Sequence, residues 1–213
     1  QVAGYDKTPT DLTDSLIANG IHVHFEDSIQ LIDVSFLNND NTLVIYTPAV
    51  PGSHKQLEYF KNKGYQVLKR SQVLGLITEQ TFCLAIAGTH GKTTTTSILG
   101  HLMFECNVPL TAFLGGISEN YNSNLIINGT EVTVVEADEF DRSFLSLHPE
   151  IAIVSSVDAD HLDIYGNIEN LKQSFEKFLS QVQKGGKVIV NQKVKLHIPE
   201  GIKSYSYSLD NSD

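Results

Sequence analysis

Residues 82–96 constrain the fold of this chain more than any other segment. Residues 82–87 are apolar and about as long as a buried strand, the turn that follows contains Gly88 and Gly91, and residues 92–104 have a helical composition. A buried strand that runs through a glycine turn into a helix is typical of parallel α/β sheets. The sequence therefore predicts a doubly wound sheet with this strand inside it.

The same turn has the composition of a phosphate-binding loop. Its glycines allow backbone N–H groups to point inwards at phosphate oxygens, and the helix N-terminus adds the positive end of its dipole. Lys92 would place a charge beside the β- and γ-phosphates, and the Thr93 hydroxyl would bind magnesium. A glycine turn with an exposed lysine is the alternative, which the flanking strand and helix disfavour. The predicted phosphate-binding residues are Gly88, Thr89, His90, Gly91, Lys92, Thr93 and Thr94.

Acidic residues follow two further predicted strands. Glu136 ends the strand at 132–136, and an acidic run containing His161 follows the strand at 151–157. Because the carboxyl ends of parallel strands share one sheet edge, Glu136 and His161 are expected to meet the metal ion bound by Thr93. Carboxylate oxygens suit magnesium, whereas imidazole is an unusual ligand for so hard a cation. Each group alone would be interpreted as a solvated surface residue, and the phosphate loop beside them favours a metal site.

Alternating β-branched and amphipathic segments predict parallel strands with helical crossovers in both halves of the chain. We place the domain boundary near residues 79–81, so that the domains are 1–79 and 80–213. The remaining predicted strands are 2–5, 21–24, 42–46, 65–68 and 187–190, and the predicted helices are 10–19, 54–63, 71–78, 92–104 and 168–182.

Charge and cysteine content narrow the class of protein. With 15 Lys and Arg against 25 Asp and Glu, the net charge is −10, and no basic stripe is present, which argues against nucleic-acid binding. No apolar run reaches the ~20 residues of a membrane span, and no signal peptide is visible. We expect a soluble, cytoplasmic protein in which Cys83 and Cys106 are reduced and partly buried. Gln1 opens the chain as if within a strand, so we expect that residues preceding it are missing.

Three ordered motifs together resemble those of the Mur ligases: residues 88–94, 136–141 and 160–166. Segments 4–6, 46–49 and 113–116 extend the resemblance over most of the chain. It implies a Rossmann-like N-terminal domain for a UDP-sugar, a P-loop α/β central domain for ATP, and a C-terminal amino-acid-binding domain outside this sequence. The expected cofactors are ATP and Mg²⁺.

The resemblance also implies a reaction and its residues. The carboxylate of UDP-N-acetylmuramate would attack the γ-phosphate of ATP, and L-alanine would then displace phosphate, a step in peptidoglycan synthesis. Lys92, Glu136 and His161 would be catalytic, and Thr93, Glu136 and His161 would bind the metal. Asp6, Thr47 and Gly116 would contact the substrate, although Asp6 is nearly as well explained as a solvated strand-end acid.

Two alternatives to this function stay open on the sequence. One is the related recycling ligase that attaches a tripeptide to UDP-N-acetylmuramate. The other is a non-catalytic nucleotide-binding module, which has little need of a complete metal shell. In either ligase the amino-acid pocket would lie outside this chain, so we expect these 213 residues alone to be inactive.

Overall fold

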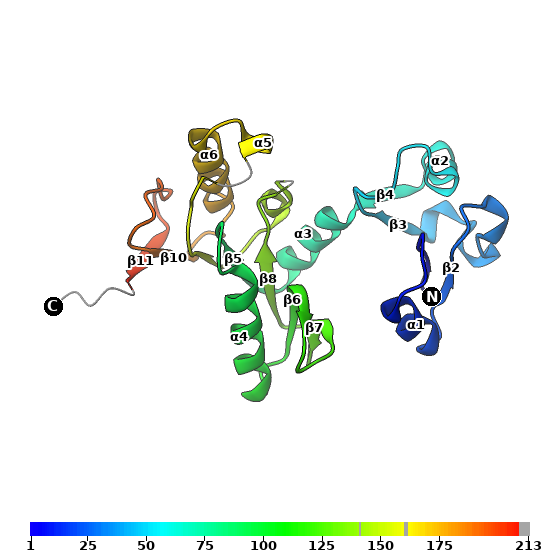
Figure 1. The fold of residues 1–213 in the computed structure, drawn as a ribbon, viewed down its shortest axis with the longest axis horizontal. Helices are drawn as coiled ribbons and strands as arrows, with labels where there is room; N and C mark the ends of the chain where they lie inside the picture. The colour runs from blue at the N-terminus through cyan, green and yellow to red at the C-terminus, as the bar shows by residue number, and fades with distance from the viewer. Residues whose placement is uncertain (141, 160–161, 209–213) are drawn as a thin grey trace. The chain divides into compact units, whose positions relative to one another are not determined.

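The computed structural model describes residues 1–140, 142–159 and 162–208. Its contacts divide the chain into two compact units, Gln1–Arg70 and Ser71–Asp213 (Figure 1). This division falls after Arg70, the first residue of helix α3 (Arg70–Gln80), whereas the boundary predicted from sequence lies at the end of that helix. The rest of α3 packs within the second unit, where the Thr78 hydroxyl accepts a hydrogen bond from the backbone N–H of His148 at 3.2 Å.

The first unit consists of two β-α-β segments. Strands β1 and β2 pair in parallel through helix α1, and β3 and β4 pair in parallel through α2. The predicted alternation of strands and helices is confirmed, but the strands form two separate two-stranded sheets. Three short 3-10 helices, η1 to η3, connect the segments. The elements are β1 (Ala3–Tyr5), α1 (Asp11–Ala18), β2 (His22–His24), η1 (Ile29–Leu31), η2 (Val34–Phe36), η3 (Asn39–Asn41), β3 (Leu43–Tyr46), α2 (Lys55–Asn62) and β4 (Gln66–Lys69).

The second unit contains a seven-stranded sheet in the order β11-β10-β9-β5-β8-β6-β7. All neighbouring strands are parallel except β6 and β7, which are antiparallel. The elements are β5 (Phe82–Ala87), α4 (Lys92–Glu105), β6 (Leu110–Ser118), β7 (Ser123–Ile127), β8 (Val132–Ala137), η4 (Ser143–Ser146), β9 (Ile151–Val154), α5 (Leu162–Tyr165), α6 (Ile168–Leu179), β10 (Lys187–Asn191) and β11 (Lys203–Tyr207).

The expectation of parallel pairing alone is therefore wrong at one edge of this sheet. Strands β6 and β7 form a hairpin that the sequence did not predict, because Gly115 and Gly116 interrupt the apolar pattern of β6. Strand β11 was also missed: four of its five residues are exposed, so it lacks the alternating apolar pattern of a half-buried strand.

Two apolar cores cover the two faces of this sheet, as a doubly wound sheet requires. Successive residues of β5 point to opposite faces. Cys83 and Ala85 pack in the core that includes Phe175 and Phe178 of α6. Leu84 and Ile86 pack in the other core, together with residues of α4. Figure 1 shows α4 and α6 in this unit. In the part of the chain that the structure describes, no helix has the length and apolar character needed to cross a membrane.

The two cysteines differ in exposure, so we expect them to differ in reactivity. Cys83 is buried in β5, and burial raises the pKa of its thiol. Cys106, expected to be partly buried, is instead exposed at the C-terminal end of α4. Because the thiolate is the reactive form, a thiol reagent should rapidly modify Cys106 alone in the folded chain and both cysteines in denaturant. Rapid modification of Cys83 before unfolding would contradict the buried position of β5.

Candidate nucleotide site

The predicted phosphate loop joins the end of β5 to the start of α4. Gly88 has φ of 135° and Gly91 has φ of 80°, a region that residues with a Cβ rarely occupy. A Cβ at Gly88 would also lie 2.2 Å from Oγ of Ser155. Conformation and close approach together require glycine at position 88, and the strand-turn-helix arrangement predicted from sequence is confirmed.

Residues that follow β9 hold the first half of this loop. Backbone N–H groups of Thr89 and His90 donate to the carbonyl oxygen and Oγ of Ser156, at 3.1 and 2.9 Å. The Ser155 hydroxyl donates to the His90 carbonyl oxygen at 2.5 Å. The amides of Thr89 and His90 thus shape the loop. The first amides of an α-helix such as α4 have no carbonyl partner within the helix, and amides of this kind suit an anion.

Lys92 begins α4 and its side chain folds back across the loop. Its Nζ donates to the Gly88 carbonyl oxygen at 2.8 Å and to Oε1 of Glu139 at 3.1 Å, and it lies 2.9 Å from Oε2 of Glu139. The Glu139 side chain is 0% exposed and the Lys92 side chain is 12% exposed. The ammonium group is therefore held in one place at the positive end of the helix dipole.

Thr93 and Glu136 face each other beside Lys92. The Thr93 hydroxyl donates to Oε1 of Glu136 at 2.9 Å, and the backbone N–H of Gly115 donates to Oε2 at 2.8 Å. A hydroxyl and a half-buried carboxylate are the oxygen donors that Mg²⁺ prefers, so this pair fits the implied metal. Within residues 1–140, 142–159 and 162–208, no three His, Cys, Asp or Glu side chains group as a metal cluster. His161, the third predicted ligand, lies outside the described residues, as do Asp141 and Asp160.

The predicted substrate-contacting residues lie in both units. Gly116 lies beside the loop, because a Cβ there would be 3.8 Å from Cγ2 of Thr93. Asp6 follows β1 in the first unit, is exposed, and accepts a hydrogen bond from the Thr8 N–H at 3.1 Å. Thr47 follows β3 and its carbonyl oxygen accepts from the Val50 N–H at 3.1 Å.

Two residues of this site had not been singled out from the sequence. Glu139 belongs to the acidic run after β8, but only its burial distinguishes it from its exposed neighbour Asp138. Gly115 stands in the resemblance segment next to Gly116, but its contact with Glu136 depends on the pairing of β6 with β8. Neither contact has a local sequence signal.

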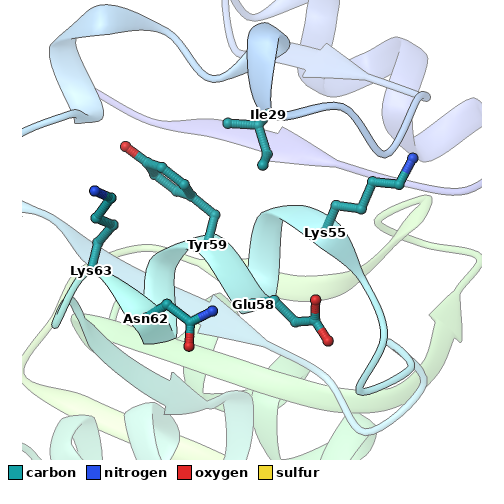
Figure 2. Close-up of a pocket in the computed structure, with 6 residues that line it drawn as sticks. All are labelled: Ile29, Lys55, Glu58, Tyr59, Asn62 and Lys63. Atoms are coloured by element: carbon teal, nitrogen blue, oxygen red, sulfur yellow. The ribbon is translucent and has the colours of Figure 1, made fainter.

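Cavities lie in both units. One of them, of about 340 Å³, lies along α2, and no predicted site residue lines it. Figure 2 shows its lining side chains. The other, of about 260 Å³, lies beside the loop at the carboxyl ends of β9 and β10. The first is lined by Ile29, Lys55, Glu58, Tyr59, Asn62 and Lys63. The second is lined by Ser155, Ser156, Val157, Asp158, Lys172, Asn191, Lys193, Val194 and Lys195.

Comparison with curated proteins finds close relatives over most of the chain. It is 56% identical over 203 residues to the UDP-N-acetylmuramate–L-alanine ligase of Flavobacterium johnsoniae, covering 95% of this chain and 44% of that protein. It is 50% identical over 212 residues to the ligase of the same name from Parabacteroides distasonis, covering 98% of this chain and 46% of that protein. The chain thus spans less than half the length of these relatives.

Solved structures and family models agree with these relatives. The UDP-N-acetylmuramate–alanine ligase of Thermotoga maritima superposes with a TM-score of 0.72 at 27% identity, over 97% of this chain and 46% of that one. A Neisseria UDP-N-acetylmuramate:L-alanyl-γ-D-glutamyl-meso-diaminopimelate ligase superposes with a TM-score of 0.80 at 21% identity, over 97% of this chain and 69% of that one. At this identity the likeness is one of fold alone. The Mur ligase middle domain matches residues 86–213, and the model described as Mur ligase family, catalytic domain, matches residues 1–81. With a glycine turn between a buried strand and a helix, and both family models matched in order, the chain belongs to the Mur ligase family.

Proposed function

We propose that this chain is the nucleotide-binding part of an ATP-dependent ligase that joins L-alanine to the carboxylate of UDP-N-acetylmuramate in peptidoglycan synthesis. The observation that carries the proposal is the placement of Lys92, Thr93 and Glu136 around the N-terminus of α4. Relatives that bear the alanine ligase name, at 47–60% identity, support the substrates. We place the reaction in the cytoplasm, where ATP is available.

The chemistry joins two anions, so the site must neutralise charge. Lys92 and the first amides of α4 would bind the ATP phosphates, and Thr93 and Glu136 would hold Mg²⁺, with His161 as the further ligand. When bound, the metal supplies positive charge to the phosphate oxygens. Attack of the muramyl carboxylate on the γ-phosphate gives an acyl phosphate and ADP, and the amine of L-alanine then displaces phosphate. This route requires no protein nucleophile.

Substrate binding extends the proposal beyond the loop. We assign residues 1–79 to the UDP-sugar, with Asp6 and Thr47 as contacts, and residues 80–213 to ATP, with Gly116 on the substrate side of the loop. The Gly116 position beside Thr93 supports its role. The amino-acid pocket would belong to a further domain, so this chain by itself would not complete the reaction.

The two alternative functions have weaker support. The Neisseria ligase whose name gives a tripeptide shares the fold at 21% identity, and the solved alanine ligase of Thermotoga maritima has 27%, whereas curated alanine ligases reach 60% over 89% of this chain. A binding module without catalysis would not need the Thr93 hydroxyl and the Glu136 carboxylate to face each other at 2.9 Å.

Phosphate release by the full-length enzyme tests the proposal. We expect release from ATP only when UDP-N-acetylmuramate and L-alanine are both present with Mg²⁺. Omission of the sugar nucleotide is the control, and release that continues without it would contradict the ligase assignment. Replacement of L-alanine by the tripeptide separates the two ligases, because turnover with the tripeptide in preference to L-alanine would indicate the recycling enzyme.

A further inference from the structure

A fully buried carboxylate contacts the lysine of the phosphate loop. Both oxygens of Glu139 lie close to Nζ of Lys92, at 2.9 and 3.1 Å, and the Glu139 side chain is 0% exposed. Removing a carboxylate from water costs several kcal/mol, and a paired cation with good geometry offsets that cost. Such a pair is weak evidence for stability, so its position beside the loop calls for a functional explanation.

The backbone of Glu139 is held from two sides. The Tyr165 hydroxyl donates to the Glu139 carbonyl oxygen at 2.5 Å, and the Arg142 N–H donates to the same oxygen at 3.0 Å. Tyr165 is itself buried, at 2% exposure, and the Arg142 guanidinium lies 5.2 Å from the centre of its ring. The carboxylate is therefore attached to a fixed point of the second unit.

This anchoring restricts Lys92. Its ammonium group has three N–H donors, and the contacts with the Gly88 carbonyl oxygen and the Glu139 carboxylate direct two of them. A free lysine side chain has many rotamers, and binding would otherwise have to restrict them. The pair is neutral overall, so the Glu139 carboxylate does not strengthen the attraction of the site for phosphate. Its contribution is to determine where the charge of Lys92 lies.

We infer that Glu139 is a positioning residue for the phosphate-transfer step, acting through Lys92: it holds the ammonium group over the loop, where charge develops between carboxylate and γ-phosphate. The inference rests on the proposed function, since it requires a nucleotide on the loop. Groups held in productive geometry lower the barrier, and misplacement by about 1 Å can reduce a rate by ~10²-fold.

The variant Glu139→Gln in the full-length enzyme tests this role. Gln keeps the size of the side chain and removes the charge that holds Lys92. We expect kcat to fall by about 10²-fold while the KM for ATP stays close to that of the wild type, because the loss is confined to the transition state. Active-site titration gives the concentration of folded, active enzyme, so that kcat can be calculated per active molecule. A purely structural role would lower the melting temperature and this concentration, but would leave kcat per active molecule unchanged. Glu131→Gln, which removes the same charge at an exposed position before β8, is the matched control and should leave both constants unchanged.

Two results would overturn the inference. Unchanged kcat would show that Lys92 finds its place without Glu139, and a lower KM for ATP at unchanged kcat would show that Glu139 instead competes with the phosphates. If Glu139→Gln does not fold, Glu139→Asp replaces it. Asp keeps the charge but withdraws the carboxylate from Lys92 by one methylene, so it tests the position of the carboxylate, and the same selective fall in kcat is expected. Failure of the wild-type enzyme to bind or turn over ATP would instead contradict the proposed function itself.

Discussion

Replacement of Lys92 by methionine should abolish turnover and also destabilise the second unit. Methionine fills a similar volume but leaves the carboxylate of Glu139, at 0% exposure, without its cation. Breaking a buried ion pair by removing one partner typically costs about 3–5 kcal/mol. We therefore expect no measurable phosphate release in the assay of the full-length enzyme. We also expect a clear fall in its melting temperature, measured by circular dichroism.

The double variant Lys92→Met with Glu139→Gln separates the two effects. It replaces the ion pair with neutral side chains, which is often close to neutral for stability. We expect it to regain most of the lost melting temperature and to remain inactive. Two observations would contradict these expectations. If Lys92→Met is as stable as the wild type, the buried pair does not contribute to stability. If the double variant turns over substrate, Lys92 is not required for the reaction.

Replacement of Gly115 by alanine should disrupt the proposed metal site with little effect elsewhere. A Cβ at this position would lie 2.1 Å from Oε2 and 2.5 Å from Cδ of Glu136, so the carboxylate must leave its present position. It would then lose its hydrogen bonds from the Gly115 N–H and the Thr93 hydroxyl. Disturbing the groups that orient a metal ligand typically costs 10–100-fold, so we expect the apparent Mg²⁺ affinity in the release assay to fall by about that factor.

The control for this variant is Gly52→Ala, because a Cβ at Gly52 would have no atom within 4 Å. It should leave the Mg²⁺ titration unchanged. An unchanged Mg²⁺ requirement in Gly115→Ala would show that the position of Glu136 does not determine metal binding, and would leave Thr93 as the only described residue of the proposed ligand set.

Local signals were sufficient where the structure depends on neighbours in sequence. The turn between β5 and α4 was predictable because Gly88 and Gly91 permit positive φ and Lys92 starts a helix. The start of α1 was predictable because Thr10 caps it, accepting a hydrogen bond from the Thr13 N–H at 3.3 Å. Predictions that needed the pairing of distant segments were less complete. The parallel pairing of β6 with β8, which brings the Gly115 N–H to Glu136, joins segments about twenty residues apart and has no local signal.

The sequence by itself determined the fold class, the glycine turn between strand and helix, and the family, because strand and helix periodicity, glycine turns and ordered motifs are all recorded along the chain. Only the tertiary structure decided which acidic side chain contacts which partner. Glu136 and Glu139 lie in one short run, yet one faces Thr93 at the sheet edge and the other is buried against Lys92, 47 positions earlier in the sequence. The physical reason is that a carboxylate's role depends on burial and on the nearest cation or donor, and both are set by packing between segments distant in sequence.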